Sequence, residues 1–518
     1  MNNTRLYSIQ NHVRRIGGLS LLAATLANCS GADETLVASA TSDEEERLAT
    51  TRSIGELRQG LGLITIIGRV VTANDVGAPG VSVELVGPTP GTAVTDANGM
   101  VRFEVAPGEF SLRPQKAGAR FTPRLTGLNG DASELNTFDC TGSCNASVSV
   151  AHDKSLLITD PSVLADARAS NASSGPWSFR FMLEQMAPPE VDAADFARAW
   201  LDEFTVPERL NGFQVERRDL SGVLPLWPTT PEGKLDLARA PFQLLAIVNR
   251  TELHATSNGE LRFVYGLVDS DGFGRSMSVI FEFELPSRDA LSGADLSRRS
   301  WVEQFQALGD LSFGADYNTS LQDLTDRVTR RGSNPSRPGG SAISQVRSNE
   351  IVMGPEWQLR EFHLTGEGQA VSLRLAPTAM TPDDVHALPD TPENDAIADY
   401  INENAVAIRG GFAAVPSTNI GGQSTVASPW AFSKPVDERG RRSFAGQTCN
   451  GCHALEAANL QLDGFYHISP TSDGGADGTD RVSEFIKRIE IPRRTAFMQN
   501  QLSCSGADCA PGAEAIFF

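Results

Sequence analysis

The fold of the central region is decided by the sequence LRFVYGLV at residues 261–268, by DSDGFG at residues 269–274 and by MSVIFEFEL at residues 277–285. Aromatic and β-branched residues dominate the first and third of these sequences, as is typical of strands. The aspartates and glycines between them favour a tight turn. The apolar sequence PFQLLAIV at residues 241–248 is typical of a buried strand. We therefore predict a β-hairpin and a buried strand in this region.

Helical and strand patterns alternate outward from this hairpin. Apolar residues recur at helical spacing in five segments, at residues 177–186, 193–204, 301–308, 321–330 and 392–409. Strand patterns occupy residues 356–364 and 371–375. Because helices and strands are mixed in this way, we predict an α+β domain of unknown function over residues 156–435.

Residues 60–128 contain short runs in which apolar and polar residues alternate, separated by turns rich in Gly, Pro and Asn. This pattern predicts a small antiparallel β-sandwich. Its turn and core positions resemble the carboxypeptidase regulatory-like, transthyretin-type domain, through PGVSVEL at residues 79–85, TDANGMVRF at residues 95–103 and PGEF at residues 107–110. The resemblance implies a spacer or binding module without catalytic residues.

The N-terminus, residues 1–29, resembles the signal peptide of bacterial lipoproteins. Three arginines precede an apolar stretch at residues 16–27 that is short for a membrane span. Cys29 follows at the position that carries the lipid in that family, with Asn28 in place of the usual small residue. Residues 30–59 are predicted to form a flexible tether. We therefore expect a lipid anchor as the membrane partner of this protein.

The net charge of the chain is −20. A surface this negative repels phosphate backbones, which argues against a nucleic-acid partner. Charge and signal peptide together predict a protein of the cell envelope, either an outer-membrane lipoprotein or a secreted protein, on the periplasmic or surface side.

The six remaining cysteines form three close pairs, Cys140/Cys144, Cys449/Cys452 and Cys504/Cys509. Because an exported protein meets an oxidising compartment, close pairs are candidate disulfides. No histidine neighbours the first pair, so a local disulfide is favoured there over a metal site. The last pair is also predicted to form a disulfide.

The sequence TCNGCH at residues 448–453 is the sharpest chemical signal in the chain. Covalent attachment of a c-type haem needs two thiols at this spacing, Cys449 and Cys452, followed directly by a histidine that binds the iron, His453. The predicted compartment also suits this cofactor. A disulfide between the two cysteines, with an incidental histidine, is the alternative.

The motif lies in residues 436–518, which we predict to be mostly helical or irregular. Two residues are candidates for the second axial ligand of the iron, Met498 and His467. Met498 also lies at helical spacing with apolar neighbours, so a core methionine is an equal alternative. The whole chain is thus predicted to be multidomain, with a β-sandwich, an α+β domain and this C-terminal segment.

The α+β domain and the C-terminal segment together resemble a family of uncharacterised envelope lipoproteins from myxobacteria and similar organisms. The resemblance is carried by LLAIVNR at residues 244–250, SNEI at residues 348–351, WQLREF at residues 357–362 and the TCNGCH motif. It implies a shared architecture and adds no activity.

The sequence therefore predicts an envelope lipoprotein that uses a c-type haem for electron transfer or redox sensing, with a redox partner or surface ligand that it does not identify. The alternative is a non-catalytic surface or binding lipoprotein with a structural disulfide at the motif. A secreted hydrolase is a weaker alternative, because the sequence contains no nucleophile elbow, zinc-protease motif or phosphate loop. The acidic loop at residues 472–480 fits no standard calcium loop and is predicted to be a solvated turn.

Overall fold

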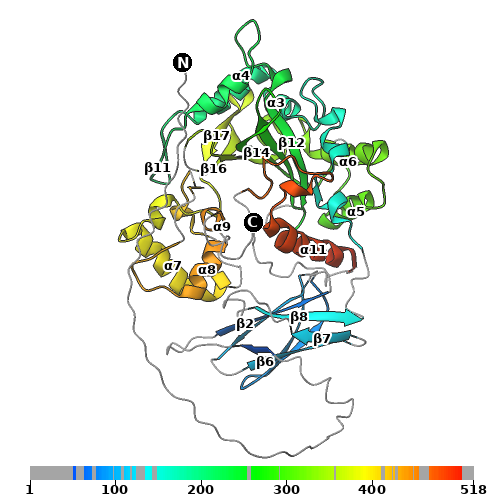
Figure 1. The fold of residues 1–518 in the computed structure, drawn as a ribbon, viewed down its shortest axis with the longest axis vertical. Coiled ribbons are helices and arrows are strands. Elements are labelled where there is room, and N and C mark those ends of the chain that lie inside the picture. Colours follow the sequence, from blue (N-terminus) through cyan, green and yellow to red (C-terminus); the bar gives the residue numbers. More distant parts are fainter. Residues whose placement is uncertain are drawn as a thin grey trace, which may run out of the picture. The chain divides into compact units, whose positions relative to one another are not determined.

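The computed structural model describes the β-rich module, the central region and much of the C-terminal segment (Figure 1). The described residues are 51–53, 64–72, 77–96, 98–106, 110–116, 119–123, 135–142, 149–253, 258–290, 292–354, 357–409, 415–422, 424–425, 430–446, 448–453 and 466–503. The predicted signal peptide with Cys29 lies outside them, as do Cys144, Cys504 and Cys509.

The β-rich module contains two four-stranded sheets, in the orders β1-β6-β3-β4 and β5-β2-β8-β7. Their strands are β1 (Thr51–Ser53), β2 (Ile64–Val71), β3 (Ser82–Val86), β4 (Gly91–Val94), β5 (Met100–Val105), β6 (Phe110–Gln115), β7 (Ala119–Pro123) and β8 (Leu135–Gly142). Strand β1 lies inside the range that was predicted as a tether. Strands β2 and β8 pair in parallel, unlike the other pairs of these two sheets.

Both sheets of this module contribute to one hydrophobic core. Val70 and Phe138 of one sheet and Val83 and Leu112 of the other are fully buried. Every second side chain of β3 and β6 is buried, as the alternating sequence predicts. The antiparallel strands and the shared core are the features that the sequence led us to expect of this module.

The central region is built around an eight-stranded antiparallel sheet with the order β17-β16-β15-β14-β13-β12-β9, in which β18 also pairs with β16. Its strands are β9 (Leu157–Ile158), β12 (Phe242–Arg250), β13 (Glu260–Val268), β14 (Gly274–Glu284), β15 (Ile343–Glu350), β16 (Gln358–Thr365), β17 (Ser372–Ala376) and β18 (Ser424–Thr425). The predicted hairpin is the pair β13–β14, and the predicted buried strand is β12. A separate small hairpin joins β10 (Glu208–Leu210) and β11 (Phe213–Val215).

One face of this sheet packs against helices through an aromatic core (Figure 1). Phe179 stacks on Phe242 at 4.3 Å between ring centroids and meets Tyr265 edge to face at 5.4 Å. The helices of the central region are α1 (His152–Ser155), α2 (Pro161–Leu164), α3 (Phe179–Met186), α4 (Ala193–Glu203), α5 (Arg298–Leu308), α6 (Ala315–Thr329) and α7 (Pro392–Arg409). The helices predicted from apolar spacing are therefore present, and the α+β architecture is confirmed.

The opposite face of the sheet is covered by the C-terminal segment. Ile468, Val482 and Ile486 of this segment pack on Val248 and Val264 of the sheet. The segment's elements are α8 (Glu438–Gly446), α9 (Cys449–Cys452), the π-helix η12 (Ile486–Glu490) and α11 (Ile491–Ser503). The predicted helical or irregular character of this segment agrees with these short elements.

Gly274 allows the C-terminal segment to lie directly on the hairpin. A Cβ atom at this position would lie 1.7 Å from the carbonyl oxygen of Pro470, so only glycine permits the contact.

Among the described residues, no helix is both long and apolar enough to cross a membrane.

Candidate functional site

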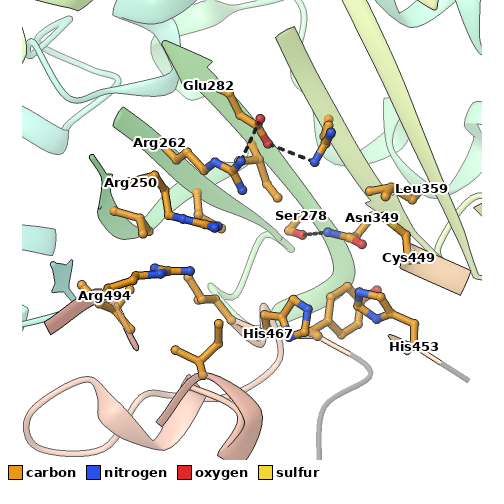
Figure 2. A pocket seen from close by; sticks show the side chains of 18 residues that line it. Arg250, Arg262, Ser278, Glu282, Asn349, Leu359, Cys449, His453, His467 and Arg494 are labelled. Atoms are coloured by element: carbon orange, nitrogen blue, oxygen red, sulfur yellow. Dashed lines mark hydrogen bonds and ion pairs between the residues drawn. The ribbon is translucent and has the colours of Figure 1, made fainter. Parts of the chain in front are cut away.

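A cavity lies between the second face of the central sheet and the C-terminal segment (Figure 2). Its volume is about 120 Å³. Cys449 and His453 lie at one end, Arg250 and Arg494 lie at the other, and His467 lies between them. The cavity therefore contains the first cysteine and the histidine of the TCNGCH motif.

The motif forms a single helical turn that places Cys449 and His453 on one side. The side chain of Thr448 caps this turn by accepting a hydrogen bond from the N–H of Gly451 at 3.2 Å. The N–H of His453 donates to the carbonyl oxygen of Cys449 at 2.9 Å, which closes the turn. Because residues four apart share a helix face, both side chains point to the same cavity.

Cys449 is a free thiol and is only 7% exposed. It packs against Trp357 and Leu359. Burial raises the pKa of the Cys449 thiol, although the charge of Arg347 opposes the shift. The sulfur is therefore protonated at neutral pH and is a weak nucleophile. The side chain of Cys452 lies outside the described part of the chain.

His453 contacts two aromatic rings. Its imidazole stacks on Trp357 at 4.5 Å between ring centroids, with 25° between the planes. The ring of His467 lies 4.9 Å from it between centroids, tilted by 49°. The two histidines that the sequence offered as iron ligands are therefore neighbours in one cavity.

The ring of His467 packs on an aromatic neighbour, and the carbonyl oxygen of this residue accepts a hydrogen bond from the N–H of Ser483 at 2.9 Å. Its ring stacks on Phe485 at 5.1 Å, and its buried Nδ1 atom makes no hydrogen bond to any described residue. Burial lowers the pKa of His467 to about 4, so that its imidazole is neutral at pH 7. A neutral imidazole is the form that binds transition metals.

Met498, the other candidate for the second axial ligand, lies elsewhere. Its side chain is fully buried in the aromatic core of the central region, together with Phe497. It is absent from the described lining of the cavity. The structure therefore brings His467, and not Met498, to the motif.

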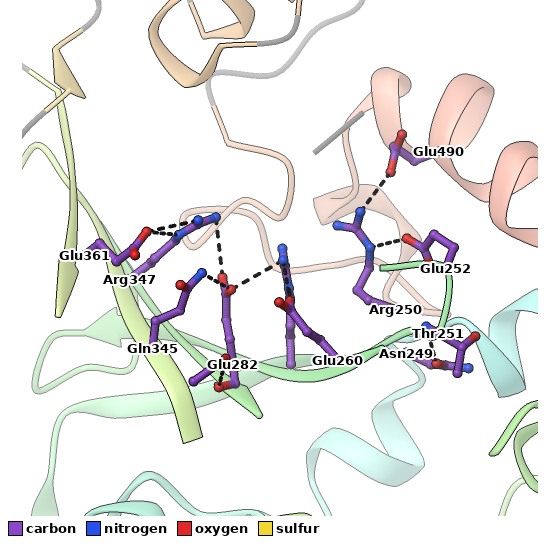
Figure 3. A network of polar contacts seen from close by, with 12 residues as sticks. Asn249, Arg250, Thr251, Glu252, Glu260, Glu282, Gln345, Arg347, Glu361 and Glu490 are labelled. Carbon is purple, nitrogen blue, oxygen red and sulfur yellow. Dashed lines mark hydrogen bonds and ion pairs between the residues drawn. The ribbon is translucent and has the colours of Figure 1, made fainter. Parts of the chain in front are cut away.

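Four arginines line the cavity and were missed in the sequence, namely Arg250, Arg262, Arg347 and Arg494. Their carboxylate partners form an ion-pair network along the sheet (Figure 3). Arg262 lies 2.7 Å from Glu260 and 3.3 Å from Glu282. For Arg250, Arg262 and Arg347, the signal that could have revealed them is a charged residue within an apolar strand, on the face opposite the aromatic core. Arg494 lies on α11 and has no such signal.

The remaining predicted sites are structural where the chain is described. Cys140 is disulfide-bonded and buried in the core of the β-rich module. Asp473 and Asp477 accept hydrogen bonds from the N–H groups of Gly475 and Thr479, as expected of a turn. No three His, Cys, Asp or Glu side chains in the described ranges are arranged to hold a metal ion.

No protein-family model, no curated protein and no solved structure matches this chain.

Proposed function

We propose that this chain is an envelope lipoprotein that binds one c-type haem covalently and serves electron transfer or redox sensing. The observation that carries the proposal is the cavity in which the free thiol of Cys449 and the imidazoles of His453 and His467 meet. Two thiols followed directly by a histidine are the attachment signal of this cofactor.

The donor chemistry of the cavity fits the cofactor. A thioether bond forms from a reduced thiol, and Cys449 is free. Both imidazoles line the same cavity, and Val264 and Ile280 contribute apolar side chains to its wall. Cys449 and Cys452 would hold the porphyrin, whereas His453 and His467 would bind the iron. The bound group would supply a one-electron couple at its iron.

The cavity must enlarge to hold a porphyrin. Its volume of about 120 Å³ is below the roughly 300–1,000 Å³ of small-molecule sites. A porphyrin therefore needs His453 and His467 to move apart, so the haem-loaded and haem-free forms differ at this contact. We expect the side chain of His467 to move, because its Nδ1 atom makes no hydrogen bond to a described residue.

The rival interpretation is a structural disulfide between Cys449 and Cys452. The free state of Cys449 supports the haem interpretation over this rival. The disulfide of Cys140 supports folding in an oxidising compartment, in agreement with the predicted lipoprotein signal.

Expression with and without the haem-attachment machinery tests the proposal. With the machinery, we expect an absorption spectrum with a Soret band that survives denaturation and organic extraction. The variant Cys449→Ala should lower the yield of covalent haem, whereas Met498→Leu should not. A colourless protein in which Cys449 and Cys452 are linked would refute the proposal.

A further inference from the structure

A row of alternating charges crosses the cavity face of the central sheet from β13 to β16 (Figure 3). Arg262 on β13 lies 3.3 Å from Glu282 on β14, and Glu282 lies 3.8 Å from Arg347 on β15. Arg347 lies 3.0 Å from Glu361 on β16. The row ends at His363, whose Nε2 atom lies 2.7 Å from Oε1 of Glu361. We call these five residues the charge row.

His363 is the member of the charge row that meets solvent. Its side chain is 43% exposed, whereas that of Glu361 is only 2% exposed. Arg347, two contacts away, lines the cavity. Histidine is the side chain that ordinarily gains or loses a proton between pH 5 and 8. The row therefore joins a group that can exchange protons with solvent to the wall of the cavity.

Glu361 is shared between Arg347 and His363. Its Oε2 atom accepts hydrogen bonds from Nε and Nη2 of Arg347 at 3.1 and 3.0 Å, and its Oε1 atom faces His363. Burial opposes ionisation of Glu361, but Arg347 and His363 hold its pKa below the ordinary value. A proton on His363 thus adds a cation to the carboxylate that compensates Arg347, in surroundings that screen charge poorly.

The ion pairs on this face contain one more carboxylate than guanidinium groups among the described residues. The four arginines are Arg250, Arg262, Arg347 and Arg494, and the five glutamates are Glu252, Glu260, Glu282, Glu361 and Glu490. With every glutamate ionised, a proton on His363 balances the excess charge. An electron that enters the cavity adds negative charge and so favours this proton further.

The strands beside β16 bring one further ion pair to His363 in the described part of the chain. Arg374 on β17 is its cross-strand neighbour, and it pairs with Glu203 of α4 at 2.6 Å. A guanidinium does not titrate between pH 5 and 8, and an ordinary carboxylate titrates below this range. The charge that changes with pH at this end of the row is therefore that of His363.

We propose that His363 takes up one proton from solvent when one electron enters the cavity, and that Glu361 and Arg347 transmit the charge. This inference rests on the proposed function, because the electron needs a redox centre beside Arg347. The electron comes from a one-electron donor, such as a redox partner, and the proton binds the ring nitrogen that does not face Glu361. Because coupling is reciprocal, the redox centre accepts an electron more readily when His363 is protonated.

The reduction potential of the haem-loaded chain from about pH 5 to about pH 8 tests this coupling. Relative to His363→Gln, the potential of the wild type should fall by about 30 mV across this range. This shift corresponds to a threefold tighter binding of the proton in the reduced form. His363→Gln keeps an N–H donor for Glu361 but cannot take up a proton.

A second variant, His363→Lys, carries a fixed positive charge at the same position. The potential of the wild type should match that of His363→Lys near pH 5 and that of His363→Gln near pH 8. The matched control is His152→Gln, which changes an exposed histidine at the start of α1. Its potential should follow that of the wild type at every pH.

NMR titration of the histidines tests the first contact of the charge row in the full chain made without haem-attachment machinery. Glu361→Gln keeps an acceptor for the N–H of Ala379 but removes the negative charge. His363 should then bind its proton about threefold more weakly, because the carboxylate at 2.7 Å is lost.

These measurements separate the possible failures. A chain that takes up no haem under attachment conditions refutes the proposed function, and the coupling with it. A haem-loaded chain whose potential has the same pH dependence in the wild type and in His363→Gln refutes the coupling alone. Unchanged proton binding by His363 in Glu361→Gln also refutes the coupling, with or without haem.

Discussion

His467 is the residue whose role is most directly testable. If the proposed haem is present, His467→Ala should leave it covalently attached, because the thioether bonds would come from Cys449 and Cys452. We expect the iron to lose one ligand and change from low spin to high spin in its absorption spectrum. Added imidazole should restore the wild-type spectrum.

The matched control for that variant is Met498→Leu, which nearly conserves the volume of a fully buried side chain. Its spectrum should be that of the wild type. A spectrum that changes in Met498→Leu and stays unchanged in His467→Ala would show that the assignment of the axial ligand is wrong.

Asp383 gives a prediction about pH and stability. Burial raises the pKa of this carboxyl to about 6 from its ordinary value of 3.8. The folded chain therefore binds the proton more tightly than the unfolded chain does, and stability falls as pH rises from about 4 to about 6. Asp383→Asn keeps an acceptor for the N–H of Val385. We expect it to raise the free energy of unfolding by about 1–2 kcal/mol at about pH 8 and to change it little at about pH 4.

Urea unfolding at the two pH values measures the effect of Asp383→Asn. An equal rise in the free energy of unfolding at both pH values would mean that the stabilisation does not come from removing the buried charge.

At the scale of single residues, the sequence predicted some of the residues that line the cavity and missed others. Spacing alone identified Cys449 and His453, because their chemistry is local. It could not choose between His467 and Met498, since both are distant in sequence and only the fold decides which one reaches the cavity. Arg250, Arg262 and Arg347 were missed because charged residues are usually exposed, and the alternation of their strands was not used to place them opposite the aromatic core. Arg494 lies on α11, and its burial depends on tertiary contacts.

At the scale of elements, the helical turn of the motif depends on its close packing against α8. A Cβ atom at Gly451 would lie 2.2 Å from the carbonyl oxygen of Ala445. Gly451→Ala should therefore push α9 away from α8, with a cost of about 1–3 kcal/mol in the free energy of unfolding and a lower yield of covalent haem.

Gly91→Ala is the matched control for Gly451→Ala, because its Cβ atom would meet Phe103 at an ordinary 3.6 Å. Thermal unfolding and haem yield of the two variants test the expectation. Equal unfolding midpoints and equal haem yields for the two variants would contradict a tight fit at Gly451.

The longer elements were predictable from sequence for a physical reason. The hairpin β13–β14 and helices α3 and α4 have apolar residues at strand and helix spacing, and these residues pack into the aromatic core. The small hairpin β10–β11 was not predicted, and its strands have only three residues each. Short strands of this kind are decided by tertiary contacts and leave little pattern in the sequence.

At the scale of the whole molecule, the proposed lipid anchor is open to a simple test. If Cys29 carries the lipid, Cys29→Ser should move the protein from the membrane fraction to the soluble fraction after cell breakage, because no acyl chains would then hold it to the bilayer. Cys449→Ser, which removes a thiol elsewhere, should stay with the membranes while its yield of covalent haem falls. Unchanged membrane retention of Cys29→Ser would contradict the anchor.

The contact of Pro470 with Gly274 has a consequence for substitutions in the hairpin. Any side chain at position 274 would have to displace the carbonyl group of Pro470, whose oxygen would lie 1.7 Å from its Cβ atom. A change of one residue in the sheet would therefore lift the C-terminal segment away from the strands that it covers.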